Sequence, residues 1–330
     1  MFLRPFIYFC IPNAIIENRI NMSLAYITWS ANPVAFTLPF IGEIRWYGIA
    51  FVLGFIIGLW IVQKIWKHEQ LPEDWYDKLF FFVIIATVVG ARLGHVLFYD
   101  PGHYFSHPLE ILNIREGGLA SHGGTLGIIL AIWIYSKKVT HKSMLWTLDR
   151  LVVPVGFVGA LIRLGNLMNH EIYGHATNLP WGFRFIENIP SWVHGYAPAY
   201  SVPSHPTQLY EAACYILTGF ICLHLYWKNR DYKYKGLIFG VFLIGIFLSR
   251  FFVEFFKNVQ VDIENNMIQT IGLDMGQVLS IPFVIAGIWF VYKGLQEKKK
   301  AVPEAATNEN TAKRTTPSIN SAKKESVKRK

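Results

Sequence analysis

Five polar residues interrupt one apolar stretch of the chain, and their types suit the binding of a phosphate group. The stretch GALIRLGNLMNHEIYG runs from Gly159 to Gly174, and its polar residues are Arg163, Asn166, Asn169, His170 and Glu171. A guanidinium stays charged in an apolar site and can hold a phosphate through two hydrogen bonds, which favours Arg163 as a phosphate ligand. Asn166 shares its face of a helix, and His170 does so if the helix continues that far. The alternative is an arginine that snorkels to a membrane surface.

Two further arginines stand in apolar stretches. Arg92 lies in GARLGHVLFYD and Arg250 in SRFFVEFFK. Arg250, Glu254 and Lys257 fall on one face of a helix. The alternative interpretation of Arg250 and Glu254 is an internal ion pair that only allows the helix to enter a membrane. Because Arg163 has no acid one helical turn away, it is the stronger candidate for a phosphate ligand.

His122 is the candidate general base. The two glycines that follow it, Gly123 and Gly124, would let a ligand or a backbone approach the imidazole closely. The ordinary pKa of a histidine suits proton transfer near neutral pH. A purely structural histidine is the alternative.

A long polar loop between residues 168 and 208 contains four histidines: His170, His175, His194 and His205. They suggest a metal site, but no HExxH or Cys/His spacing is present, so we expect no metal. The loop is better interpreted as a lid or as a platform for a protein substrate. The motif HPTQLYEA at its end predicts a helix start, with Glu211 favourable near the helix N-terminus.

The composition indicates a membrane protein. Of 330 residues, 52% are hydrophobic, 16% aromatic and only 16% charged, which is more apolar surface than one soluble core can bury. The net charge of +9 does not indicate nucleic acid as a partner, because the segment 293–330 holds eleven Lys and Arg against four acids. We expect residues 296–330 to be a disordered basic tail attracted to anionic headgroups.

Seven apolar stretches predict an all-α, polytopic membrane protein. They span residues 46–66, 79–98, 122–135, 151–167, 209–227, 237–256 and 275–292. The connecting loops alternate between rich and poor in Lys and Arg, and basic loops stay in the cytoplasm. The pattern predicts an N-terminus outside and a cytoplasmic C-terminus. The chain then divides into an amphipathic approach over 1–44, a seven-helix catalytic domain over 45–295 and the tail.

This topology predicts that three arginines lie at one depth in the membrane. Arg92, Arg163 and Arg250 each follow the start of an outward-running span by 12 or 13 residues, about 18–20 Å in a hydrocarbon core about 30 Å thick. His122 and Tyr47 begin spans at the same outer side, as do Gln208, Tyr210 and Gln277. Buried charge must be paired or solvated, so we expect a polar cavity that opens outward or sideways.

The N-terminus and the cysteines carry less information. Residues 1–21 lack a clean cleavage site, so we expect no signal peptide, and Met22 is an alternative start. The cysteines Cys10, Cys214 and Cys222 have no metal-type spacing and are interpreted as buried filler. We expect no disulfide between Cys214 and Cys222, which fall on one span.

The polar stretch, together with six other motifs, resembles the prolipoprotein diacylglyceryl transferases of bacterial membranes. These motifs cover residues 44 to 292 in the family's order: IRWYGIAFVLGF from Ile44, GARLGHVLFYD from Gly90, SHGGTLGIILA from Ser121, HPTQLYEA from His205, SRFFVEFFK from Ser249 and DMGQVLSIPFVIAG from Asp274. The resemblance implies that diacylglycerol moves from phosphatidylglycerol to the lipobox cysteine of a prolipoprotein signal peptide. It also implies a location in the bacterial inner membrane.

The resemblance assigns roles to particular residues and requires no cofactor or metal. It implies that His122, Arg163 and Arg250 are catalytic. The headgroup or scaffold residues that it implies are Tyr47, Asn166, Glu171, Gly174 and Glu254. Arg92, Arg163 and Asn169 are further candidate substrate-binding residues because of their place in the apolar stretches. The chain departs from the family at two positions, with Ile246 where a tyrosine is common and Lys257 where an arginine is common.

Three other classes of protein are alternatives. A transporter or channel for an anion would also use intramembrane arginines, but it predicts broken helices and polar groups that are accessible in turn from both sides. An intramembrane serine protease would need a GxSG motif, which is absent. A scaffold protein would leave the three arginines without a purpose.

Overall fold

The computed structural model describes residues 26–40, 42–113, 118, 120–228, 235–258, 267 and 269–315. The first 25 residues, with Cys10 and Met22, lie outside this part of the chain. The chain divides into two units, which are described separately. The first combines Met1–Val52, Leu161–Ala212 and Phe252–Asp274, and the second combines Leu53–Ala160, Ala213–Phe251 and Met275–Lys330.

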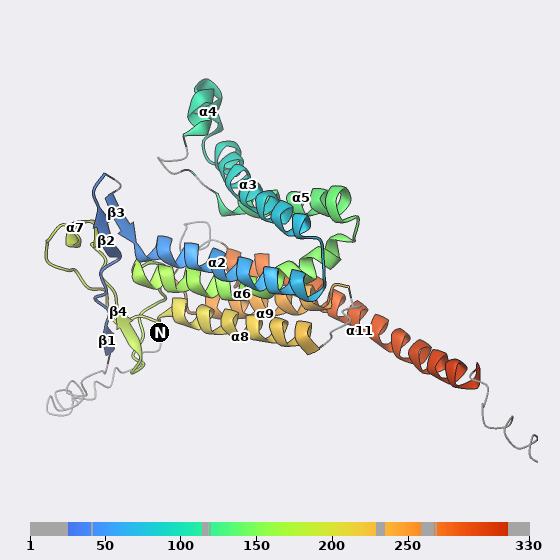
Figure 1. Ribbon diagram of the computed structural model, residues 1–330. Coiled ribbons are helices and arrows are strands. Elements are labelled where there is room, and N and C mark those ends of the chain that lie inside the picture. Colours follow the sequence, from blue (N-terminus) through green and yellow to red (C-terminus); the bar gives the residue numbers. More distant parts are fainter. Residues whose placement is uncertain are drawn as a thin grey trace, which may run out of the picture. The chain divides into compact units, whose positions relative to one another are not determined.

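Helices make up most of the described chain (Figure 1). Six are long and apolar enough to cross a membrane: α2 Trp46–His68, α3 Glu73–Phe98, α6 Met144–Met168, α8 Thr207–Lys228, α9 Leu237–Glu254 and the Met275–Glu297 part of α11. Their outer faces carry large exposed apolar side chains, such as Ile56 and Trp60 on α2, as lipid-facing helices do. The prediction of a multi-span helical protein is therefore confirmed at this level.

The third expected span is shorter than the others. Helix α5, Ser121–Tyr135, has 15 residues and continues as a π-helix of five residues, η2 Ser136–Thr140. A membrane crossing needs about 20 residues, so α5 by itself is too short. The count of seven spans and the orientation of the chain stay predictions.

Two small sheets correct the all-α prediction. Strand β1 Tyr26–Thr28 pairs in parallel with β4 Gly182–Arg184, and β2 Val34–Leu38 pairs antiparallel with β3 Gly42–Arg45. The described residues of the expected amphipathic approach, 26–40 and 42–44, are thus largely extended. Valine, phenylalanine and threonine on β2 favour strands, and Gly42 at a φ of 95° lets the hairpin turn.

Short helices and the tail complete the described chain. Helix α4 Pro101–Ser106 and the 3₁₀ helix η1 Pro108–Leu112 follow α3, and α7 Ile189–Trp192 lies in the loop before α8. Helix α11 extends from Met275 to Thr315, where the sequence predicted a disordered tail from residue 296. Alanine, glutamate and lysine are frequent in this segment and are strong helix formers. Residues 316–330 are outside the described part.

Glycines let the helices of the second unit pack closely. A Cβ on Gly94 of α3 would lie 2.6 Å from the Cα of Gly123 of α5, so the two backbones touch. Figure 1 shows α3 and α5 side by side. Gly240 on α9 and Gly287 on α11 meet in the same way, with a Cβ on Gly240 only 2.7 Å from the Gly287 carbonyl oxygen. Small residues at such crossings are typical of membrane helix packing.

A buried ion pair ties α2, α6 and α8 together in the second unit. Both Nε and Nη2 of Arg150 donate to Oε2 of Glu69, at 2.9 and 2.7 Å, and the hydroxyl of Tyr226 donates to Oε1 at 2.7 Å. The guanidinium also lies over the ring of Trp146, 3.8 Å from its centroid. Each charge therefore has a partner, as buried ions require.

Candidate active site

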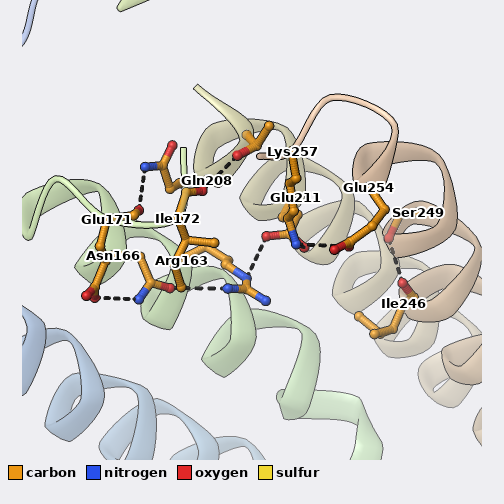
Figure 2. Close-up of polar contacts among 11 residues, drawn as sticks. Arg163, Asn166, Glu171, Ile172, Gln208, Glu211, Ile246, Ser249, Glu254 and Lys257 are labelled. Atoms are coloured by element: carbon orange, nitrogen blue, oxygen red, sulfur yellow. Dashed lines mark hydrogen bonds and ion pairs between the residues drawn. The ribbon is translucent and has the colours of Figure 1, made fainter. Parts of the chain in front are cut away.

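A buried carboxylate links two cations in the first unit (Figure 2). Glu211 of α8 is fully buried, and its Oε2 lies 2.8 Å from Nε of Arg163 on α6. This contact is an ion pair without hydrogen-bond alignment, since Oε2 makes no hydrogen bond among the described residues. The other carboxylate oxygen accepts a hydrogen bond from Nζ of Lys257 at 3.0 Å. Lys257 also donates to Glu254, at the end of α9, at 3.1 Å.

A chain of amides extends from the other side of Arg163. Its Nη1 donates to Oδ1 of Asn166 at 3.3 Å, and Nδ2 of Asn166 donates to Glu171 at 2.8 Å. Nδ2 of Asn169 donates to the same carboxylate oxygen of Glu171 at 3.1 Å. Figure 2 shows Asn166 between Arg163 and Glu171. The structure thus brings together the four polar residues of the stretch that we interpreted as headgroup residues.

Arg163 keeps access to its surroundings, unlike its partners. Its side chain is 16% exposed, whereas that of Glu211 is 0% exposed. Glu171 is exposed and Asn166 is buried. The guanidinium is therefore oriented from two sides by fixed groups, and the side chain stays partly accessible, which is the arrangement that a ligand site needs.

The first turn of α8 fixes the chain that follows α6. Gln208 donates from Nε2 to the carbonyl of Glu171 at 2.7 Å, and Thr207 donates from Oγ1 to the carbonyl of Ile172 at 2.8 Å. Both side chains are fully buried. Ile172 has a φ of 61°, a conformation that is strained for a β-branched residue. The HPTQLYEA motif therefore does more than begin a helix, since it holds Glu171 in place.

Gly174 lies where two segments cross without room for a side chain. Its amide donates to the carbonyl of His205 at 2.9 Å, and Asn258 donates to its carbonyl at 3.0 Å. A Cβ at this position would overlap the carbonyl oxygen of Phe256 and lie 2.9 Å from the Cβ of His205. A glycine here allows the segment with Lys257 to lie against the loop.

His170 connects three segments and does not continue the face of α6. The helix ends at Met168, and His170 has a left-handed backbone with a φ of 57°. Its Nδ1 accepts from the amide of Ile186 at 3.0 Å, so Nε2 carries the proton and donates to the carbonyl of Ala31 at 2.9 Å. Burial lowers the pKa of His170, and the hydrogen bond to Ala31 opposes that shift. The sequence placed His170 on the face of Arg163 only if the helix continued that far, and the helix ends two residues before it.

The other loop histidines bind neighbouring groups. His175 contacts the carbonyl of Phe255 at 2.9 Å, His194 contacts that of Pro190 at 2.6 Å, and His205 contacts the hydroxyl of Tyr210 at 3.2 Å. No group of three His, Cys, Asp or Glu side chains that could hold a metal occurs among the described residues.

Tyr47 packs against the middle of the polar stretch. A Cβ on Gly165 would lie 2.9 Å from Cδ2 of Tyr47 and 3.1 Å from its Cα. Gly165 is two residues after Arg163 and directly before Asn166. The start of α2 therefore touches α6 beside the proposed phosphate ligand.

Three predicted site residues belong to the second unit. Arg250 lies near the end of α9 and is half-buried. His122 is exposed in the first turn of α5, with its ring centroid 6.5 Å from that of Tyr99. Arg92 is 5% exposed and donates to the carbonyl oxygens of Glu110, Ile111 and Gly118. Their role in one site with Arg163 stays a prediction.

Sequence reasoning underestimated Glu211 and Lys257. Glu211 was interpreted only as a favourable charge near a helix start. Lys257 was interpreted as sharing a helix face with Arg250 and Glu254 and as a departure from the family. The structure gives Glu211 two cationic partners in one buried cluster. A signal was available, because an acid within an apolar span requires a partner and the chain offers few cations at that level.

Comparisons with known proteins agree with this arrangement. The profile of the family described as prolipoprotein diacylglyceryl transferase matches residues 33–293. A phosphatidylglycerol–prolipoprotein diacylglyceryl transferase of Porphyromonas gingivalis is 55% identical over 274 residues, which are 82% of this chain and 96% of the relative. Enzymes of the same name are 43% identical in Chloroherpeton thalassium, over 83% of this chain and 96% of the relative, and 40% identical in Bacteroides fragilis, over 86% and 99%.

The matched region contains every residue of the Arg163 cluster, which consists of Arg163, Asn166, Asn169, Glu171, Glu211, Glu254 and Lys257. The family membership expected from the sequence motifs is confirmed. The chain belongs to the prolipoprotein diacylglyceryl transferase family and is a bacterial multi-span membrane transferase that modifies lipoproteins.

Proposed function

We propose that Arg163 binds the phosphate of phosphatidylglycerol while the lipobox cysteine of a prolipoprotein attacks the adjoining glycerol carbon. The observation that supports this proposal most strongly is the Arg163 cluster. Glu211 and Asn166 hold the guanidinium from two sides, 2.8 and 3.3 Å away, while the side chain stays 16% exposed. A preoriented, partly accessible guanidinium suits a diester phosphate, which offers two oxygens to its fork.

The proposed chemistry is a displacement at carbon. The cysteine sulfur forms a bond to the glycerol carbon, the carbon–oxygen bond to the phosphate breaks, and glycerol phosphate leaves. The products are a diacylglyceryl thioether and a phosphate monoester. The nucleophile and the leaving group both come from the substrates, so this displacement needs no cofactor.

His122 is the proposed base. A free thiol has a pKa of about 8.5, so near neutral pH only a small fraction is ionised. An imidazole can take the proton as the sulfur attacks, which contributes typically about 10²–10⁴-fold to a rate. The exposed position of His122 at the start of α5 leaves its ring accessible to a substrate.

In this proposal, arginines stabilise the negative charge of the leaving phosphate. The phosphate gains negative charge as the carbon–oxygen bond breaks, so Arg163 and Arg250 would stabilise the transition state more than the ground state. The proposed headgroup or scaffold residues are Tyr47, Asn166, Asn169, Glu171, Gly174 and Glu254. In the structure, Glu171 anchors both asparagines, and Glu254 pairs with Lys257.

We also propose that the site faces the outer half of the bacterial inner membrane. The alternation of basic loops supports an outer N-terminus, seven spans and a cytoplasmic C-terminus. Single cysteines at Tyr196 and Ser143 test this in a chain without Cys10, Cys214 and Cys222, because both positions are exposed. An impermeant thiol reagent added to intact cells should label position 196 and spare position 143. The reverse pattern would invert the topology.

Reconstitution tests the reaction itself. The full chain in phosphatidylglycerol vesicles should add one diacylglyceryl unit to a lipobox peptide, as a mass gain on the cysteine. Arg163→Lys should abolish most of this gain, whereas Arg45→Lys, an equal change at an exposed arginine, should keep it. A lysine variant of Arg163 with normal turnover would remove that residue from the proposed phosphate ligands.

A further inference from the structure

Arg92 has the same residue type as Arg163 but quite different neighbours. Its guanidinium donates from Nε to the carbonyl of Ile111 at 2.8 Å, from Nη2 to that of Glu110 at 2.6 Å and from Nη1 to that of Gly118 at 3.1 Å. It lies over the ring of Tyr104, 4.8 Å from the centroid. All three nitrogens of the guanidinium thus donate to main-chain carbonyls between residues 110 and 118.

Two of these three carbonyls lie at the end of a helix, where hydrogen-bond donors are in demand. Glu110 and Ile111 belong to the last turn of η1, Pro108–Leu112, where the carbonyls of a helix run short of donors. The carbonyl of Glu110 also accepts from the amide of Asn113 at 3.0 Å, so Arg92 is its second donor. The five N–H donors of a guanidinium point in fixed directions and can satisfy several carbonyls at once, which the single ammonium of a lysine cannot do. Arg92 therefore caps η1 and binds the chain beyond it.

Gly118 lies so close to the guanidinium of Arg92 that no side chain fits between them. It has a φ of 73°, and a Cβ there would overlap Nη1 of Arg92 and lie 2.8 Å from Cδ2 of His95. The main chain thus passes directly against the charged group. Any side chain at position 118 would displace either the loop or the arginine.

The segment held in this way leads directly into His122. Ala120, two residues after Gly118, donates from its amide to the carbonyl of Ala91 on α3 at 2.9 Å. Helix α5 begins at the next residue, and Gly123 packs on Gly94 with no space between them. Ala91 and Gly94 contact the start of α5, and the guanidinium of Arg92 holds the residues before it. Together they determine where the first turn of α5 begins.

We propose that Arg92 is a positioning residue that fixes the first turn of α5 and thereby aims His122 at the reacting thiol. The proposal rests on the proposed function for the role of His122 as base. It assigns Arg92 to the main chain, whereas the sequence placed Arg92 among the candidate substrate-binding residues. A displacement of about 1 Å at a catalytic group can lower a rate about 10²-fold.

The pH dependence of Arg92→Lys distinguishes this role from the others. A peptide thiol with a pKa of about 8.5 is about 3% ionised at pH 7 and about 75% ionised at pH 9, so a defect in the base matters less at the higher pH. We expect Arg92→Lys to lower kcat at least tenfold at pH 7 and less than about threefold at pH 9. The KM for phosphatidylglycerol should change less than twofold.

Four variants complete the experiment in the full-length, reconstituted enzyme. Gly118→Ala keeps the arginine in the sequence but displaces the loop or the guanidinium. It should show the same pH-dependent loss, which covers the case that Arg92→Lys does not fold. His122→Gln should follow the same trend, and Arg163→Lys should lose as much at pH 9 as at pH 7. Glu110→Gln should match the wild type, because Arg92 binds the main chain of Glu110 while its carboxylate pairs with His103 at an exposed position.

Each contrary result has a separate meaning. A raised KM for phosphatidylglycerol in Arg92→Lys would make Arg92 a phosphate ligand and overturn the proposal. A loss equal at both pH values, in Arg92→Lys and Gly118→Ala but not in His122→Gln, would leave Arg92 a merely structural role. A pH-independent loss in His122→Gln as well would refute His122 as the base, and a wild type without product would refute the proposed function.

Discussion

Arg163 and Arg92 lie in similar apolar sequence contexts, yet they have different partners. Both are followed by Leu-Gly and preceded by a nearby Gly-Ala on long apolar helices, in GALIRLG and in GARLG. Arg163 contacts side chains, an acid and an amide, and is 16% exposed. Arg92 contacts three main-chain carbonyls and is 5% exposed. The first arrangement can accept a ligand, and the second stabilises a segment.

The difference shows that an intramembrane arginine is not necessarily a ligand site. The energetic demand is the same in both places, since a buried cation must have hydrogen-bond acceptors around it. Main-chain carbonyls satisfy that demand without any second charge, and acidic side chains satisfy it with one. The partners of each arginine, more than its depth, therefore indicate what it does.

The largest expected effect is the loss of Arg163. Arg163→Gln should lower kcat/KM by about 10²–10³-fold, the range found when one transition-state donor is removed. Arg163→Lys should be nearly as damaging, because a point charge cannot reproduce the fork. Steady-state rates with the lipobox peptide measure both variants. Full activity in the lysine variant would indicate a role in charge balance alone.

Removal of Glu211 should be the next largest effect and should act on stability as well. Glu211→Gln leaves Arg163 and Lys257 without their shared carboxylate, and breaking a buried pair costs about 3–5 kcal/mol. The double variant Glu211→Gln with Lys257→Met should unfold at a higher temperature than Glu211→Gln, because it removes a buried ammonium that would otherwise be left with Glu254 alone. Thermal unfolding in detergent measures this. Equal unfolding temperatures would show that Lys257 depends on other partners.

Gly174→Ala tests whether close main-chain contact is as important near Arg163 as it is near Arg92. The new Cβ would overlap the carbonyl of Phe256, so the segment bearing Lys257 must move. We expect about a tenfold loss of kcat/KM and a lower unfolding temperature. Gly195→Ala is the control, since its Cβ would meet nothing within 4 Å, although its φ of 94° adds some strain. An unchanged Gly174→Ala enzyme would show that this contact does not position the site.

His170 should make the first unit sensitive to acid. Its pKa in the folded protein is lowered by burial, so the unfolded chain binds more protons and stability is lost as pH falls below about 6.5. The unfolding temperature of the wild type should therefore drop between pH 7.5 and 5.5. In His170→Asn the starting value should be lower and the drop smaller. An identical drop in both proteins would assign the acid sensitivity to other groups.

The smallest expected effect is that of the tail. Removal of residues 297–330 should leave turnover per molecule unchanged, because this segment follows the apolar part of α11 and contains none of the proposed site residues. The yield in the membrane is measured separately. Slow turnover with normal yield would give the tail a part in catalysis.

The sequence predicted the long apolar helices and singled out the polar residues among them, but not the partners of those residues. Apolar length and the family motifs were sufficient for the helices and for the Arg163 stretch. They could not show that α6 ends at Met168, because His170 and Ile172 adopt left-handed conformations that tertiary contacts impose. The strands β1 and β4 pair across about 150 residues of sequence, and no local pattern encodes such pairing.

The same limit applies to the two arginines. Both depth and residue type placed Arg92 and Arg163 in one class. Only the structure distinguished the carbonyls of residues 110, 111 and 118 from the carboxylate of Glu211 as partners. Those carbonyls contact the arginine directly, so the arginine and its partners could not be predicted separately.

Equilibrium binding of phosphatidylglycerol tests the central claim most directly, because it needs no turnover. A fluorescent phosphatidylglycerol is titrated into the purified enzyme in a zwitterionic detergent, with Arg45→Lys as the control. We expect the Kd to rise at least tenfold in Arg163→Lys and to change less than twofold in Arg92→Lys. An unchanged Kd in Arg163→Lys, or a raised Kd in Arg92→Lys, would contradict the distinction between a ligand arginine and a positioning arginine.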